Sequence, residues 1–65
     1  MLKYFIKEKE ISRVEYEKLI IEDAEIYGQT KSVALSVIRE NKQSAKEDGQ
    51  CDWMLFNGNI ITIKN

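Results

Sequence analysis

Few residues of this chain can carry out covalent or metal chemistry. The 65 residues include no histidine and a single cysteine, Cys51. A zinc site draws on several Cys and His ligands, and the common Ser/His and Cys/His nucleophile pairs need an imidazole. Neighbouring carboxylates such as Glu22 and Asp23 have no third ligand at the spacing of a metal site. We therefore expect a protein that is not an enzyme and needs no metal or other cofactor.

The chemistry that remains is polar recognition, concentrated between residues 31 and 46. Four hydrogen-bonding side chains recur there at spacings that share one face of a helix. They are Ser32, Ser36, Arg39 and Gln43. Arg and Gln are common readers of base edges in the major groove of DNA. This pattern predicts the reading face of a recognition helix, and the plainer alternative is a solvated helix surface.

The small net charge of −1 hides a segregation of charge along the chain. Residues 13–27 carry a net charge of −3, whereas residues 29–46 carry +3. The lysines predicted to contact phosphates are Lys31, Lys42 and Lys46. A basic helix on an acidic body can meet the backbone of double-stranded DNA. Because so few phosphates would be neutralised, we expect weak, salt-sensitive binding that is cooperative on repeated sites or made by a homodimer.

Local signals predict the first helix and the strand before it. Ser12–Glu15 has the Ser-x-x-Glu spacing of a capping box, so a helix should begin at Arg13. Gly28 stands where a left-handed residue commonly ends a helix. Leu2–Ile11 combines aromatic and branched residues with charges of alternating sign and is predicted to be one short, half-exposed strand. The predicted inner face of the helix is Val14, Tyr16, Ile20, Ile21, Ala24 and Tyr27.

The second helix is predicted from Lys31 to about Lys46. Thr30 and Ser32 are both suited to cap its first turn. Its predicted inner face is Val33, Ala34, Val37 and Ile38. Residues 47–50 are predicted to form a loop. Two helices joined by about three residues that include a glycine fit a helix-turn-helix.

The end of the chain carries the strongest local signal. Asp52–Phe56 and Asn59–Ile63 flank Asn57-Gly58, the preferred sequence of a two-residue type I′ turn, and so predict a β-hairpin. The expected cross-strand pairs are Phe56 with Asn59, Leu55 with Ile60, Met54 with Ile61 and Trp53 with Thr62. The predicted fold is thus a single α+β domain over residues 1–65, a small winged helix-turn-helix with an N-terminal strand, two helices and a C-terminal hairpin wing.

Residues 53–64, Trp-Met-Leu-Phe-Asn-Gly-Asn-Ile-Ile-Thr-Ile-Lys, resemble the wing of excisionases from Gram-positive conjugative transposons and phages. Ile21–Ala24, Tyr27 and Arg39–Asn41 resemble the first helix and the end of the recognition helix of that family. The resemblance implies a non-catalytic DNA-binding protein of a mobile element that assists a tyrosine integrase in DNA recombination. Asn57, Asn59 and Lys64 would then contact DNA beside the groove that the recognition helix enters.

The sequence is also compatible with a different class of function, the binding of another protein. Leu19, Ile26 and Leu35 fall outside the predicted inner faces and could form part of a protein interface. They suggest a protein-binding module or inhibitor of phage origin that keeps the fold and binds a protein instead of DNA. A third alternative is a homodimer paired through Lys3–Ile11. No apolar run is long enough for a membrane span, and a lone thiol is typical of the cytoplasm.

Overall fold

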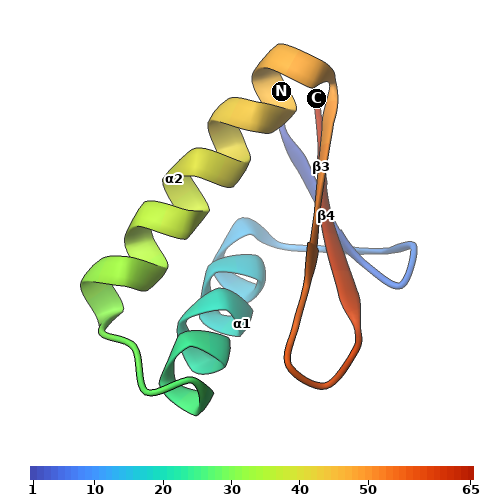
Figure 1. Ribbon diagram of the computed structural model, residues 1–65. Helices are drawn as coiled ribbons and strands as arrows, with labels where there is room; N and C mark the ends of the chain where they lie inside the picture. The colour runs from blue at the N-terminus through green and yellow to red at the C-terminus, as the bar shows by residue number, and fades with distance from the viewer.

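Two β-hairpins enclose a pair of helices in chain order. The computed structural model describes all residues from Met1 to Asn65. The elements are β1 (Lys3–Ile6), β2 (Lys9–Ile11), α1 (Arg13–Ile26), α2 (Lys31–Asp48), β3 (Gln50–Met54) and β4 (Ile60–Lys64). The strands form one antiparallel sheet in the order β2-β1-β4-β3, and both helices cover the same face of it (Figure 1). The α+β class is confirmed.

The N-terminal segment is a hairpin, so the prediction of one strand over Leu2–Ile11 is wrong. The turn residues Lys7 and Glu8 have φ angles of 48° and 70°, the left-handed pair that a two-residue hairpin turn requires. Neither residue is glycine or asparagine, so the turn carries none of the residue types that mark such a turn in a sequence. β1 lies between β2 and β4, so its edges are both occupied. Pairing of two copies through Lys3–Ile11 is therefore blocked, apart from the three residues of β2.

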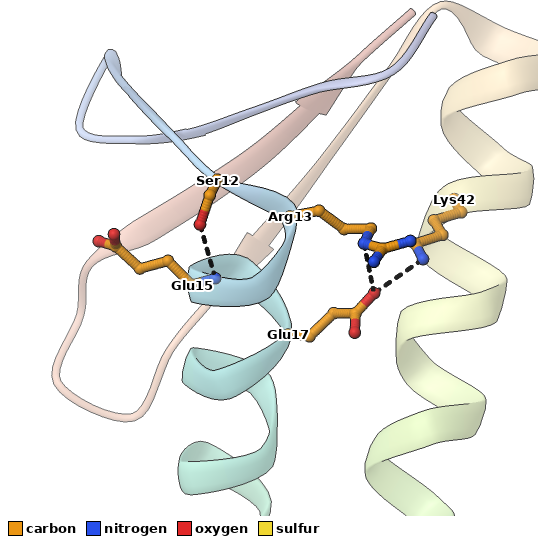
Figure 2. A network of polar contacts seen from close by, with 5 residues as sticks. All are labelled: Ser12, Arg13, Glu15, Glu17 and Lys42. Atoms are coloured by element: carbon orange, nitrogen blue, oxygen red, sulfur yellow. Dashed lines mark hydrogen bonds and ion pairs between the residues drawn. The ribbon is translucent and has the colours of Figure 1, made fainter.

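The first helix begins and ends where its caps predict. Ser12 Oγ accepts a hydrogen bond from the backbone N–H of Glu15 at 3.0 Å. Figure 2 shows this bond and the Glu15 carboxylate turned away from Ser12, so the reciprocal half of the capping box is absent. At the other end Gly28 takes a φ of 72°. The N–H of Gln29 then donates to the carbonyl of Ala24 at 2.8 Å, which closes the last turn.

The second helix is longer than predicted. Thr30 is its cap, since its Oγ1 accepts from the N–H of Val33 at 3.3 Å. The helix continues to Asp48, and Gly49 ends it with a φ of 87°. One left-handed residue turns the chain directly into β3 at Gln50. The predicted loop over residues 47–50 is therefore wrong.

The core lies between the sheet and the two helices. Its buried apolar residues are Tyr4, Tyr16, Ile20, Ala24, Ala34, Ile38, Ala45, Leu55, Ile61 and Ile63. Three predicted core residues are exposed instead: Val14 by 67%, Tyr27 by 59% and Val33 by 42%. On each helix the buried face is narrower than the face that carries apolar residues. Some apolar side chains therefore remain at the surface.

A buried polar pair fixes the two helices relative to each other. Asn41 Nδ2 of α2 donates to the Tyr16 hydroxyl of α1 at 3.1 Å. The Tyr16 ring is fully buried and packs on Tyr4 of β1, with ring centroids 5.2 Å apart. Burial raises the pKa of the Tyr16 hydroxyl to about 12, because the charged form would lose its hydration.

The Tyr16 hydroxyl predicts a loss of stability in alkaline solution. The unfolded chain releases this proton near pH 10, whereas the folded protein holds it until about pH 12. Between these values the unfolded state binds fewer protons, so the free energy of unfolding should fall as pH rises. Urea titrations from pH 8 to 12 should show a steeper fall for the native chain than for Tyr16→Phe. Equal slopes would contradict the prediction.

The β1–β2 turn predicts a stabilising double substitution. Lys7→Asn with Glu8→Gly supplies residues that adopt positive φ with little strain. The free energy of unfolding should rise by about 1 kcal/mol, the lower end of the cost of a left-handed non-glycine residue. The denaturation midpoint should increase without a change in its slope. Lys9→Asn, within β2, is the control and should not stabilise.

Candidate recognition surfaces

The four polar residues of the predicted reading face lie on α2, opposite its buried stripe. Ser32, Arg39 and Gln43 are exposed and Ser36 is half-buried. Arg39 Nη2 donates to Ser36 Oγ at 3.3 Å, and Gln43 Nε2 donates to Glu47 Oε1 at 2.9 Å. The structure therefore brings the four together on one outward face of the helix.

One of the three lysines of this helix is held in an ion pair with α1. Lys42 Nζ binds Glu17 Oε2 of α1 at 2.9 Å, and Arg13 Nε lies 3.9 Å from the same oxygen (Figure 2). A phosphate contact by Lys42 would have to break this pair. Lys31 and Lys46 are exposed and make no ion pair.

The charge of the second helix changes once its end is known. Because α2 includes Glu47 and Asp48, it carries four cations and three anions, or a net charge of +1. The value of +3 for residues 29–46 therefore overstates its basic character. Three cations remain for phosphates after the pairing of Lys42: Lys31, Arg39 and Lys46.

The C-terminal hairpin is confirmed, but its predicted register is wrong by one residue. Trp53 pairs with Ile61 and Met54 with Ile60. The N–H of Gly58 donates to the carbonyl of Leu55 at 2.9 Å, and Gly58 has a φ of 85°. This is a three-residue loop with the glycine in its left-handed last position. Asn-Gly fits this loop as well as a type I′ turn, and the sequence cannot separate the two. A one-residue shift moves every side chain to the other face.

The hairpin tip is packed against the C-terminal end of α1. Asp23 is buried, and its Oδ1 accepts a hydrogen bond from the backbone N–H of Phe56 at 2.6 Å. The ring of Phe56 meets Tyr27 edge to face, with centroids 5.4 Å apart. Within the tip, Asn57 Oδ1 accepts a hydrogen bond from the N–H of Asn59 at 3.0 Å. The tip is thus held by the helix layer.

Lys64 belongs to a different surface. It alternates along β4 with the buried Ile61 and Ile63, so it lies on the open face of the sheet, away from the helices. Its Nζ sits 5.1 Å from the centre of the Phe5 ring. The structure therefore separates Lys64 from the outward face of α2.

An apolar groove between α2 and β3 was not foreseen. We call it the α2–β3 groove; it is lined by Asp23, Tyr27, Gln29, Val33, Val37, Trp53 and Met54 and has a volume of about 290 Å³. Its walls come from the helices and from β3. Sequence reasoning missed it because Tyr27, Val33 and Val37 were assigned to the core. One signal was available in the sequence. The predicted apolar faces of the two helices were broader than a chain of this length can bury.

Two of the three residues expected at a protein interface lie together. Leu19 and Ile26 line a small pocket of about 100 Å³ between α1 and the hairpin tip, whereas the exposed Leu35 lies on α2 and does not line it. None of the three lines the α2–β3 groove.

The contact between Asp23 and the hairpin tip predicts a specific response to substitution. Asp23→Ala leaves the Phe56 N–H without its acceptor and should lower the free energy of unfolding by about 2 kcal/mol. Amide exchange at Phe56 should become faster, because the tip loses its anchor. Asp23→Asn retains an oxygen acceptor and is the matched control. Unchanged exchange at Phe56 in Asp23→Ala would show that the bond does not hold the tip.

The structure and the comparisons add three further findings. No three His, Cys, Asp or Glu side chains come close enough together to hold a metal ion. Neither helix has the length and apolar composition needed to cross a bilayer. Comparison with protein-family models, curated proteins and solved structures finds no match to this chain.

Proposed function

We propose that this protein is a non-catalytic module that binds another protein through the α2–β3 groove. The observation that carries the proposal is the cluster of exposed apolar side chains at this groove. Tyr27, Phe56 and Met54 are each more than half exposed, and Val33 lies beside them. Tyr27 directly follows α1, Phe56 lies in the hairpin tip, Met54 ends β3 and Val33 lies in the first turn of α2, yet they meet in one place.

Clustering distinguishes these residues from ordinary exposed hydrophobics. Single apolar side chains are common on protein surfaces, whereas a contiguous patch marks an interaction site. Aromatic residues and methionine are also the types enriched at the centre of protein interfaces. None of the ion pairs of the protein involves a residue of the groove, and the Asp23 carboxyl in its wall already accepts a hydrogen bond from the Phe56 N–H.

DNA binding through the outward face of α2 is the second candidate function. It is favoured by the alignment of Ser32, Ser36, Arg39 and Gln43 on one exposed helix face. In this proposal the protein is an excisionase-like or transcriptional regulator of a phage or mobile element. Three free cations would give a slope of about −2.7 for log K against log salt concentration. Binding of that kind is weak, and we place it second for this reason.

Paired valine substitutions separate the two functions. Val33→Asp puts a charge in the α2–β3 groove, whereas Val14→Asp puts the same charge in the first turn of α1, outside the groove. Both sites lie near a helix N-terminus, where an aspartate is favourable, so both variants should fold. We expect Val33→Asp to weaken the purified protein complex at least tenfold and Val14→Asp to leave it unchanged.

Arg39→Ala completes the test. It should leave a protein complex unchanged, whereas it would abolish DNA binding measured by fluorescence anisotropy at low salt. A complex that survives Val33→Asp, or a DNA complex lost with Arg39→Ala, would replace the protein-binding proposal with the second candidate or with another surface.

A further inference from the structure

β3 has a free edge beside the α2–β3 groove. It is an outer strand, with β4 on one side and no strand on the other. The ladder to β4 uses the backbone groups of alternate residues, as shown by the bonds from Leu55 N to Asn59 O at 2.8 Å and from Asn65 N to Gly49 O at 3.0 Å. The backbone groups of Gln50, Asp52 and Met54 therefore point outward.

These outward groups have almost no partners. None of the three N–H groups donates to another backbone group. The only hydrogen bond to one of the carbonyls is from Cys51 Sγ to the oxygen of Asp52, at 3.9 Å. An unpaired row of donors and acceptors is a template for one more strand.

We propose that the partner binds as an extended segment that adds a fifth strand along β3, with a basic residue beside Asp52 and an apolar side chain in the α2–β3 groove. This inference rests on the proposed protein-binding function and specifies its mode. In such β-strand addition the main-chain bonds give affinity, and pockets for alternate side chains give specificity.

The register of the new strand follows from the pleat. Asp52 projects from the open face of the sheet, whereas Trp53 projects toward the helices and lines the groove. Met54, the last residue of β3, also lines the groove. A partner residue paired with Trp53 would place its side chain in the groove, against Val33 and Val37. Its neighbours would lie beside Asp52 and Met54. The segment therefore reads basic, apolar, apolar at three successive positions, in either chain direction.

The charge of Asp52 argues against a second copy as the occupant. Two β3 strands paired over their full length about a two-fold axis would place Asp52 directly opposite Asp52, and like charges in that position are destabilising. Hydrogen bonds from Thr62 Oγ1 at 2.8 Å and Gln50 Nε2 at 3.1 Å hold the pKa of the Asp52 carboxyl below its usual value. The carboxylate therefore stays ionised at neutral pH and favours a basic partner.

The groove has room for an apolar side chain of the partner. Its volume is about 290 Å³, and five of its seven lining residues are apolar. The opposite edge of the sheet is less suited to strand addition, because β2 has only three residues and presents Lys9 and Glu10 to solvent.

Two capped peptides, Thr-Thr-Lys-Leu-Val-Thr-Thr and Thr-Thr-Val-Leu-Lys-Thr-Thr, test the inference in both chain directions. Each is titrated into the full ¹⁵N-labelled chain. One of them should shift the amide signals of Gln50, Asp52 and Met54 and slow their hydrogen exchange. The same peptide with Glu in place of Lys should bind about fivefold more weakly. Asp52→Lys should reverse that preference.

Met54→Pro and Met54→Thr provide the matched pair. Proline removes an outward N–H that the ladder to β4 does not use, whereas threonine keeps it. Peptide affinity should fall at least tenfold more in Met54→Pro than in Met54→Thr, with the remaining amide spectrum preserved.

Three outcomes would overturn the inference. One is no shift at these three amides with either peptide at about 1 mM. Another is protection of the same amides that rises with protein concentration alone, which would identify a second copy as the occupant. The third is a protein complex lost with Val33→Asp but retained in Met54→Pro, which would leave the proposed function standing without strand addition.

Discussion

The pairing of β1 with β4 is the constraint on which the rest of the molecule depends. It joins two hairpins that lie at opposite ends of the chain, with Tyr4 opposite Ile63 and Ile6 opposite Ile61. A lone two-stranded hairpin is marginally stable, whereas four strands present a face broad enough to cover with two helices. The core residues Tyr4, Ile61 and Ile63 share that face only when this pairing has formed. The hydrophobic layer is therefore a product of contacts between distant parts of the sequence.

Two buried polar residues fix the positions of the helices and the hairpin tip relative to one another. Asn41 ties α2 to α1 through Tyr16, and Asp23 ties α1 to the hairpin tip through Phe56. Both bonds join segments more than 20 residues apart, so they select one arrangement of elements. Asp23 also lines the α2–β3 groove, and the anchor for the tip is thus part of its wall. A groove built on such fixed contacts is preorganised, which lowers the entropic cost of binding.

The helix caps and the second hairpin could be predicted from the sequence. The way in which the elements pack against one another was harder to predict. Ser12 marked the start of α1, and Asn57-Gly58 marked the second hairpin, because each signal acts within a few residues. The first hairpin left no signal, since Lys7 and Glu8 take a conformation usually reserved for glycine or asparagine. The α2–β3 groove was hidden for another reason: periodicity shows which helix face is apolar, whereas only packing shows how much of that face is covered.

The antiparallel pairing of the first and last strands also brings the chain ends together. Lys3 lies opposite Lys64, and Figure 1 shows the N- and C-termini at the same end of the sheet. Closely spaced termini at a surface are the geometry that tolerates circular permutation and insertion into a loop of a host protein. A short linker could join the two ends, and the exposed link at Gly28–Thr30 offers a place for new ones. The domain is therefore portable: it can be carried within another chain while the surfaces of α2 and β3 remain accessible.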